Sequence, residues 1–212
     1  MNQDYKVAVI GATGKSGKFV LAQLLELGIA CKVLLRKPEH LSVKSNTVEV
    51  LQGDARNYQS ILELIRGCQA VVSTLGQPAG EPFIFSRATD NVIEAMNTCG
   101  LKRYILTTGL NVDCLLDNKS DSVRMATEWM RTNYPETTRD KQLEYELLVR
   151  SNLDWTLIRL PLIELSQSRS EIICSEVDCP GTKISAASLA FFIAGQLTDI
   201  QYIRRSPFIA NQ

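Results

Sequence analysis

A strand, a glycine-rich turn and a helix follow one another at the start of the chain, and this succession most restricts its possible folds. Residues 7–25 read VAVIGATGKSGKFVLAQLL. The stretch Gly14-Lys15-Ser16 matches the last part of an ATPase phosphate-binding loop, but that loop requires a glycine five positions before Gly14, where Val9 stands. The spacing therefore excludes an ATPase loop of this type.

The same glycines are better spaced as Gly11-x-x-Gly14-x-x-Gly17. Between a strand and a helix, residues without side chains let backbone amides and the helix amino end approach a pyrophosphate. We therefore predict a dinucleotide site formed by six residues of this turn, Gly11, Thr13, Gly14, Lys15, Ser16 and Gly17. The alternative is a tight strand-to-helix turn without a ligand, in which Lys15 is only solvated.

The rest of the chain continues the alternation of strand and helix. Short β-rich apolar runs cover residues 5–10, 31–35, 47–51, 70–74, 103–107 and 155–160. Helical patterns between them end at glycines, which are common helix stop signals. Continuous apolar strands are typical of a parallel sheet covered on both faces. We predict an α/β fold, a doubly wound parallel sheet of the Rossmann type, with residues 1–212 in a single domain.

The pattern loosens after the fifth strand. We expect helices near 121–132 and 138–151, separated by Pro135, because proline interrupts a helix interior. The tail predicts a strand pair around IIC and TKIS, a helix over 186–197 and a last short strand near 201–203. We expect this tail to form a small C-terminal cap on the carboxyl edge of the sheet.

Composition excludes several classes of function. The 23 basic and 23 acidic residues balance, so no net field favours nucleic acid or a membrane as partner. His40 is the only histidine, which excludes a zinc site built on several histidines, and we expect it at the surface. The six cysteines lack a C-x-x-C motif, and Cys174 and Cys179 are the one candidate redox pair. We expect a cytoplasmic monomer or small homo-oligomer without a metal.

Cofactor choice is indicated at the end of the second strand, in KVLLRKP. An acidic residue there would hold a ribose 2′-hydroxyl, whereas this chain has Arg36 and Lys37. A guanidinium offers a planar fork to phosphate, so we predict NADP(H) rather than NAD(H). The alternative is two solvated charges before a proline turn.

The third and fourth strands end in two further candidate segments. GDARN places Asp54 and Ala55 where they would lie against the adenine, although Asp54 is equally explained as a turn residue. STLGQP places Leu75 and Gly76 beside the cofactor, since a glycine permits close backbone approach.

With the glycine turn, Arg36, GDA, STLG and TTG in one order, the chain resembles the atypical short-chain dehydrogenases/reductases of the NmrA-like superfamily. Within them it is most similar to the biliverdin reductase B, or NADPH-dependent flavin reductase, branch. The likeness covers nearly the whole chain, including DKQLEYELLVRSNLDWTLIRLPLI and KISAASLAFFIAGQLT. It implies hydride transfer from NADPH to a small-molecule acceptor.

One departure from the wider superfamily bears on the reaction. No tyrosine has a lysine four residues later, so the usual Tyr-x-x-x-Lys acid is absent. Flavins, quinones and linear tetrapyrroles can accept a hydride and take their proton from water, so the absence favours such planar acceptors. The rival interpretation is a non-catalytic NADP(H) sensor resembling NmrA-like regulators; a sugar-nucleotide or isomerase relative is a third.

The resemblance also assigns the reacting end of the site. The hydroxyl residue that ends the fifth strand near the nicotinamide is matched by Thr108, with Thr107 just before it. The alternative is that Thr108 is only a β-branched residue at the end of a strand. Leu162 replaces the family's histidine, while Pro161 and Ile163 are candidates to line the nicotinamide pocket through backbone and apolar contact. A plain turn at the strand end explains Pro161 and Ile163 equally well. Four apolar loop residues are candidates to cover a flat acceptor, or else core residues: Phe83, Leu110, Leu115 and Leu116.

Overall fold

The computed structural model describes residues 5–43, 45–77, 81 and 83–212. Its strands are β1 (Lys6–Ile10), β2 (Ala30–Leu35), β3 (Val48–Gln52), β4 (Ala70–Ser73), β5 (Arg103–Gly109), β6 (Asp154–Leu160), β7 (Leu162–Glu164), β8 (Ile172–Ser175), β9 (Lys183–Ser185) and β10 (Phe208–Asn211). Its α-helices are α1 (Gly17–Glu26), α2 (Tyr58–Ile65), α3 (Ile84–Cys99), α4 (Asp121–Asn133), α5 (Pro135–Arg150) and α6 (Ala186–Gly195), and a short 3₁₀ turn η1 covers Pro38–His40.

Eight strands form one central sheet in the order β3-β2-β1-β4-β5-β6-β10-β8. All pairs are parallel except β10 with β8. The chain winds outward from β1 toward β3 and then returns to β4 on its other side, so the strand order reverses between β1 and β4. This is the doubly wound arrangement predicted from the alternating pattern, and in such sheets ligands bind at the carboxyl ends of the strands at the reversal.

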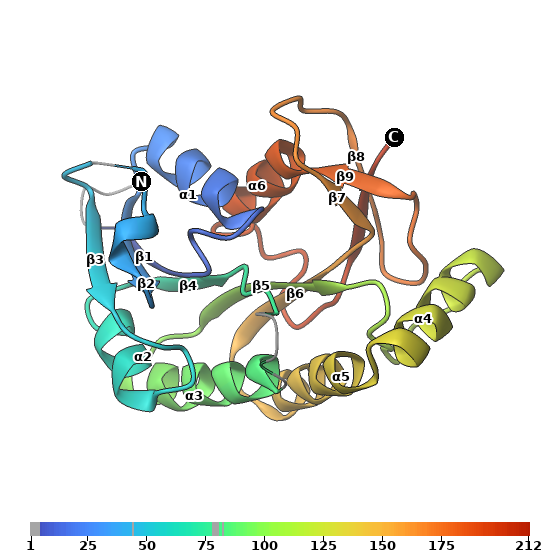
Figure 1. Cartoon of the computed structure of the whole chain (residues 1–212), viewed down its shortest axis with the longest axis horizontal. Helices are drawn as coiled ribbons and strands as arrows, with labels where there is room; N and C mark the ends of the chain where they lie inside the picture. Colours follow the sequence, from blue (N-terminus) through green and yellow to red (C-terminus); the bar gives the residue numbers. More distant parts are fainter. Residues whose placement is uncertain (1–4, 44, 78–80, 82) are drawn as a thin grey trace.

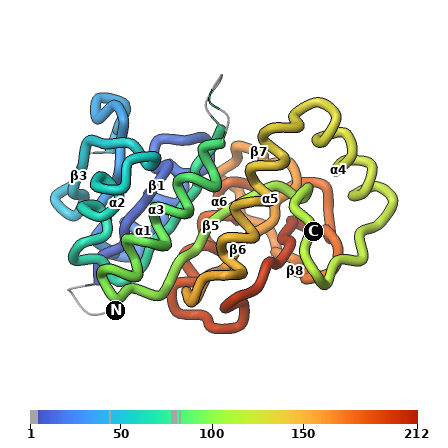
Figure 2. Tube along the Cα trace, turned by 90° about the horizontal axis from the view of Figure 1, so that it is seen from below, coloured from blue at the N-terminus to red at the C-terminus, as the bar shows by residue number. Residues whose placement is uncertain are grey.

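Helices cover both faces of the sheet (Figure 1). Val7 and Val9 of β1 point into the core beneath α1 and α6, whereas Ala8 and Ile10 point into the core beneath α2, α3 and α5. The alternation follows from the two-residue period of a strand. Seen from below, α3 and α5 lie side by side and α4 extends toward the margin of the molecule (Figure 2).

The tail differs from its prediction in its pairing. Strands form at both predicted places, but β8 pairs with β10 and β9 pairs with β7, so the two do not pair with each other. Residues 201–203 form a turn, and the last strand is β10, whose Phe208 and Ile209 are fully buried. Their burial beside β6 extends the main sheet, so only the two-stranded β7–β9 sheet remains as a cap at the end of β6.

Two smaller predictions also need correction or comment. The two predicted helices form, but the break between them falls at Tyr134, and α5 begins at Pro135 instead of 138. Proline is tolerated as the first helical residue, because its missing N–H has no helical partner to lose. Cys174 and Cys179 are both free thiols, so no disulfide joins the candidate redox pair.

The glycine turn brings the start of α1 into close contact with the end of β1. Gly11 has φ of +83°, and its carbonyl oxygen would lie 2.0 Å from a Cβ built on Gly17. The same Cβ would lie 2.7 Å from the Thr74 hydroxyl oxygen. Only a glycine at position 17 therefore allows α1 to start directly over the end of β1.

We expect Gly17→Ala to lower the free energy of unfolding by at least about 2 kcal/mol, because its methyl group would overlap the rigid backbone of Gly11. Gly195→Ala is the matched control: this exposed residue ends α6 and has no atom within 4 Å of a built Cβ. That change should be neutral or stabilising by up to about 1 kcal/mol, because alanine is the better helix former. Urea unfolding followed by circular dichroism measures both, and equal effects would contradict the packing argument.

Candidate active site

A cleft of about 670 Å³ opens at the carboxyl ends of the strands around the reversal. The structure brings most of the predicted cofactor residues together on its wall, namely Gly11, Thr13, Gly14, Arg36, Lys37, Asp54, Ala55, Leu75 and Gly76. They come from the ends of β1, β2, β3 and β4, which parallel pairing places along one edge. His40 also lines the cleft and is exposed, in agreement with its predicted surface position.

The remaining residues of the glycine turn lie beside the wall of this cleft. Lys15 is exposed, and Ser16 precedes α1 without capping it through its side chain. Gly17 is buried under the turn, so it acts through packing. The amino end of α1 therefore has no side-chain cap in the structure, a situation in which an anion can take the free N–H groups.

Arg36 lies in a row of alternating charges. Its guanidinium is 2.7 Å from a Glu81 carboxylate oxygen, and the other Glu81 oxygen is 2.8 Å from Arg56. Arg56 in turn contacts Asp54 at 2.6 Å, and its hydrogen bonds hold the pKa of that carboxyl below its ordinary value. Asp54 also accepts the backbone N–H of Arg56, so it is a turn residue as well as a cleft residue.

Arg56 is a cation that the sequence reasoning missed. It directly follows the GDA segment in the sequence. Its closeness to Arg36 could have been predicted only from the pairing of the second and third strands. Because β2 and β3 pair in parallel, their carboxyl ends place the two guanidinium groups on the same carboxylate.

The predicted reacting residues lie outside the lining of this cleft. Thr108 is buried near the end of β5, and its hydroxyl has no hydrogen-bond partner among the described residues. Thr107 is half-buried on the opposite face of the same strand. Pro161 is buried directly after β6, and Ile163 packs against the core beneath α1 and α6. Leu162, at the position of the family's histidine, is exposed.

The candidate acceptor-covering residues are dispersed. Phe83 and Leu116 are partly exposed and Leu115 is almost fully exposed, whereas Leu110 packs against a small cluster near Phe208. Leu115 and Leu116 line a separate groove with Tyr145 and Trp155. The structure therefore does not gather these four residues into one cover.

Lys141 of α5 is a second residue that the sequence reasoning missed. Its ammonium nitrogen would lie 3.6 Å from a Cβ built on Gly109, the last residue of β5, and is 4.9 Å from the ring centre of Phe85. Thr137 stands four positions earlier, where a Tyr-x-x-x-Lys pair would have its tyrosine, and its hydroxyl donates to Gln77 on the cleft wall at 3.4 Å. The Tyr-x-x-x-Lys pattern could not identify Lys141, because the tyrosine of the pattern is absent.

A buried carboxyl group lies one helical turn beyond Lys141. Glu144 accepts a hydrogen bond of 2.8 Å from Thr89, whose hydroxyl is 3.2 Å from that of Tyr104. Burial raises the pKa of Glu144 to about 7, although Thr89 and Lys141 oppose the shift. Burial also lowers the pKa of Lys141, against the opposing charges of Glu144 and Asp140. These side chains form a desolvated polar cluster between α3, α5 and the end of β5.

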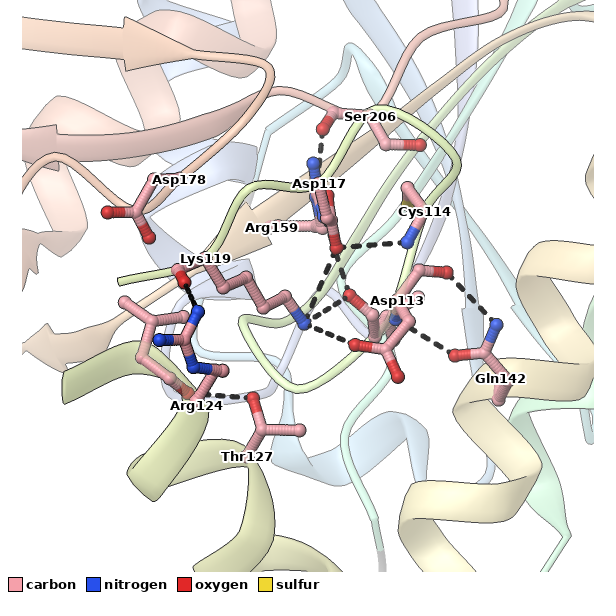
Figure 3. Close-up of polar contacts among 12 residues, drawn as sticks. Asp113, Cys114, Asp117, Lys119, Arg124, Thr127, Gln142, Arg159, Asp178 and Ser206 are labelled. Atoms are coloured by element: carbon pink, nitrogen blue, oxygen red, sulfur yellow. Dashed lines mark hydrogen bonds and ion pairs between the residues drawn. The ribbon is translucent and has the colours of Figure 1, made fainter. Parts of the chain in front are cut away.

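The loop after β5 is held in place by a buried arginine (Figure 3). Arg159 of β6 is fully buried, pairs with Asp117 and donates to the Ser206 carbonyl at 2.8 Å. Lys119 bridges Asp117 and Asp113 at 3.5 and 2.7 Å. Gln142 of α5 bonds both the N–H and the carbonyl of Asp113, so the loop is fixed to the helix that carries Lys141.

Among the residues that the structure describes, no group of three or more histidine, cysteine, aspartate or glutamate side chains is arranged to hold a metal ion. Nor does any helix in that part of the chain combine the length and apolarity needed to cross a bilayer.

Reductases are found among the curated proteins whose sequences are similar to this chain. The curated relatives include (4-alkanoyl-5-oxo-2,5-dihydrofuran-3-yl)methyl phosphate reductase of Streptomyces griseus, 27% identical over 72% of this chain and 46% of its own length. They also include isoflavone reductase homolog A622-like of Nicotiana tabacum, 31% identical over 53% of this chain and 38% of its own length. The chain thus spans less than half the length of these curated relatives.

Solved structures share the fold across almost the whole chain. The oxidoreductase ylbE of Lactococcus lactis superposes with a TM-score of 0.81 at 16% identity, covering 98% of this chain and 91% of that one. A short-chain dehydrogenase/reductase of Veillonella parvula, in complex with NADP, superposes with a TM-score of 0.79 at 15% identity, covering 98% and 94%. The family model described as NAD(P)H-binding matches residues 11–200. The chain therefore belongs to the NAD(P)H-binding family of Rossmann-type proteins.

Proposed function

We propose that this protein is an NADPH-dependent reductase that passes a hydride to a flavin or a similar planar acceptor, such as a quinone or linear tetrapyrrole. The observation that carries the proposal is the position of a half-buried lysine, Lys141, beside the end of β5, while the predicted dinucleotide residues line a cleft at the ends of β1 to β4. The reductase names of the curated relatives support the reaction class.

The cleft's charges favour a cofactor with a 2′-phosphate. Arg36 and Arg56 share Glu81, so two guanidinium groups stand at the ends of β2 and β3 with one carboxylate between them. A phosphate carries more charge than a carboxylate and matches the planar guanidinium donors. The 2′-phosphate would replace Glu81 as the partner of Arg36, while Gly11, Gly14 and the amino end of α1 would hold the pyrophosphate.

The residues near β5 suit acceptor reduction. When bound, NADPH supplies the hydride, and the acceptor then carries extra negative charge. Lys141 would stabilise that charge from a desolvated position, where an electrostatic interaction is stronger than in water. Thr108 would orient the acceptor or a water molecule through its unpartnered hydroxyl. With Thr137 in the tyrosine's place, water remains the proton source.

Steady-state NADPH oxidation with a panel of flavins and quinones tests the proposal as a whole. Acceptor-dependent turnover is the expected result. Tight NADPH binding without turnover on any acceptor would instead identify a non-catalytic sensor, the role that the absent tyrosine also permits.

Arg36→Ser should weaken NADPH binding by roughly 10- to 150-fold, the equivalent of a charge-assisted hydrogen bond of about 1.5–3 kcal/mol, and should barely change NADH binding. Fluorescence titration with both cofactors measures this. Arg66→Ser is the control, because Arg66 is exposed at the end of α2 and does not line the cleft. An equal loss for both cofactors would mean that Arg36 serves the fold rather than the 2′-phosphate.

Thr108→Val should lower flavin turnover by only about tenfold, since an orienting hydroxyl contributes near 1.4 kcal/mol. Lys141→Met should cost about 100-fold or more in kcat, because it removes charge stabilisation in a desolvated site, while NADPH affinity stays unchanged. Stopped-flow hydride transfer with saturating NADPH separates the two variants. A loss above about 1,000-fold in Thr108→Val would identify the hydroxyl as an obligatory proton donor.

Glu144 makes stability depend on pH with a definite sign. Its pKa in the folded protein is about 7, against an ordinary value of 4.5, so the folded state holds the proton more tightly than the unfolded chain. The contribution of Glu144 to the free energy of unfolding is therefore greatest below pH 4.5, falls as the pH rises toward 7, and is constant above it.

Glu144→Gln removes this titration, so the stability of the variant relative to the wild type should rise between about pH 4.5 and 7. Urea unfolding at a series of pH values measures the difference. Glu146→Gln is the control on the same helix, since this side chain is 45% exposed. Parallel pH curves for the wild type and Glu144→Gln would show that the buried carboxyl group does not hold its proton.

A further inference from the structure

A second cavity, of about 320 Å³, lies between the loop after β5 and the helices α4 and α5. Its charged and amide lining residues are Asn111, Asp113, Arg131, Arg139 and Gln142. They come from three separate elements, so the cavity exists only in the folded chain. Nothing in the proposed cofactor cleft uses these side chains.

The cavity adjoins the reacting end of β5 through Gly109. A Cβ built on Gly109 would lie 2.3 Å from the amide oxygen of Asn111 and 3.6 Å from the ammonium nitrogen of Lys141. Asn111 therefore lines the cavity while touching the same backbone position as the lysine that would face the acceptor. Gly109, at the end of β5, is thus a shared neighbour of Lys141 and of the cavity residue Asn111.

Most polar groups of the lining are already engaged. Arg131 divides its guanidinium between Asp113 and Glu128, and Asp113 also binds Lys119. The side-chain amide of Gln142 is hydrogen-bonded to the backbone N–H and carbonyl of Asp113. The carboxylate of Asp113 is thus neutralised by Arg131 and Lys119. These contacts fix the loop without a ligand.

Two donors of the lining remain without a partner among the described residues. Asn111 is 3% exposed, and its amide nitrogen has no hydrogen-bond acceptor. Arg139, an exposed residue of α5, makes no ion pair within that part of the chain. An unsatisfied buried donor costs free energy, and an acceptor group of a ligand would remove that cost. A free amide and a free guanidinium beside Arg131 together favour a negatively charged group.

We propose that this cavity binds an anionic group of the electron acceptor, a phosphate, carboxylate or sulfonate, so that the acceptor is a planar molecule with a negatively charged substituent. Arg139 and Asn111 hold the anion, and Arg131 adds positive charge. The proposal rests on the proposed reductase function for its substrate, but anion binding can be measured without turnover.

The experiment compares acceptors that differ by one anionic group. The protein is first saturated with NADP⁺, which fills the 2′-phosphate site, and is then titrated with FMN or with riboflavin while flavin fluorescence is followed. FMN should bind about tenfold more tightly. In turnover assays, 1,4-naphthoquinone-2-sulfonate should show a lower KM than 1,4-naphthoquinone.

Arg139→Gln should weaken FMN binding about tenfold, leave riboflavin binding unchanged and raise KM for the sulfonate without changing kcat. Asn111→Ala tests the second donor and should act in the same direction. Arg150→Gln is the control, because Arg150 is an exposed arginine at the other end of the same helix. Circular dichroism establishes that each variant is folded.

Three results separate this proposal from the reductase function. If the anionic compounds bind more tightly than the neutral ones and Arg139→Gln removes this preference, the cavity proposal is supported. This holds even if no acceptor is turned over and the reductase function fails. Equal binding of the charged and neutral members of both pairs overturns the cavity, even if both are reduced. No measurable binding of FMN or of the sulfonate overturns it as well.

Discussion

The close approach of Gly17 to the backbone of Gly11 and to Thr74 is the constraint on which the rest of the structure depends. No side chain fits there, so α1 begins directly over the end of β1, beside the end of β4. This contact fixes the first helix at the point where the strand order reverses. The uncapped start of α1 therefore lies beside the cleft that these strand ends form.

A second constraint organises the carboxyl half of the chain. Arg159 is fully buried, and its guanidinium lies 3.5 Å from the ring centre of Phe208 while it bonds to groups on the β5–α4 loop, near β8 and before β10. A charge so deeply buried is tolerable only with a partner, which Asp117 supplies. The strands added by the tail and the loop that carries Asn111 are therefore tied to the same side chain (Figure 3).

These two constraints put the proposed chemistry on rigid elements. The proposed cofactor residues stand at strand ends, while Lys141 and Glu144 stand on α5, which Gln142 joins to the loop after β5. Asp140 of the same helix accepts the N–H groups of Phe85 and Ser86 at 2.8 and 3.2 Å and so caps α3. The helix that lacks the usual tyrosine is thus held on both sides. A lysine carried by a helix that is fixed in this way is suited to electrostatic stabilisation of a charged acceptor.

Local pattern by itself determined the order of strands and helices through β6, the glycine turn and the cation at the end of β2, because each depends on residues close together in the chain. Tertiary structure alone decided which distant residues meet. Arg56 joins Arg36 only because β2 and β3 are paired, and Glu144 is perturbed only because α3 and β5 bury it. Likewise, the sequence predicted a last strand at 201–203, whereas the strand forms at Phe208–Asn211, where Phe208 is buried against Arg159. Periodicity records which face of an element is apolar, whereas pairing and desolvation depend on what the fold places against it.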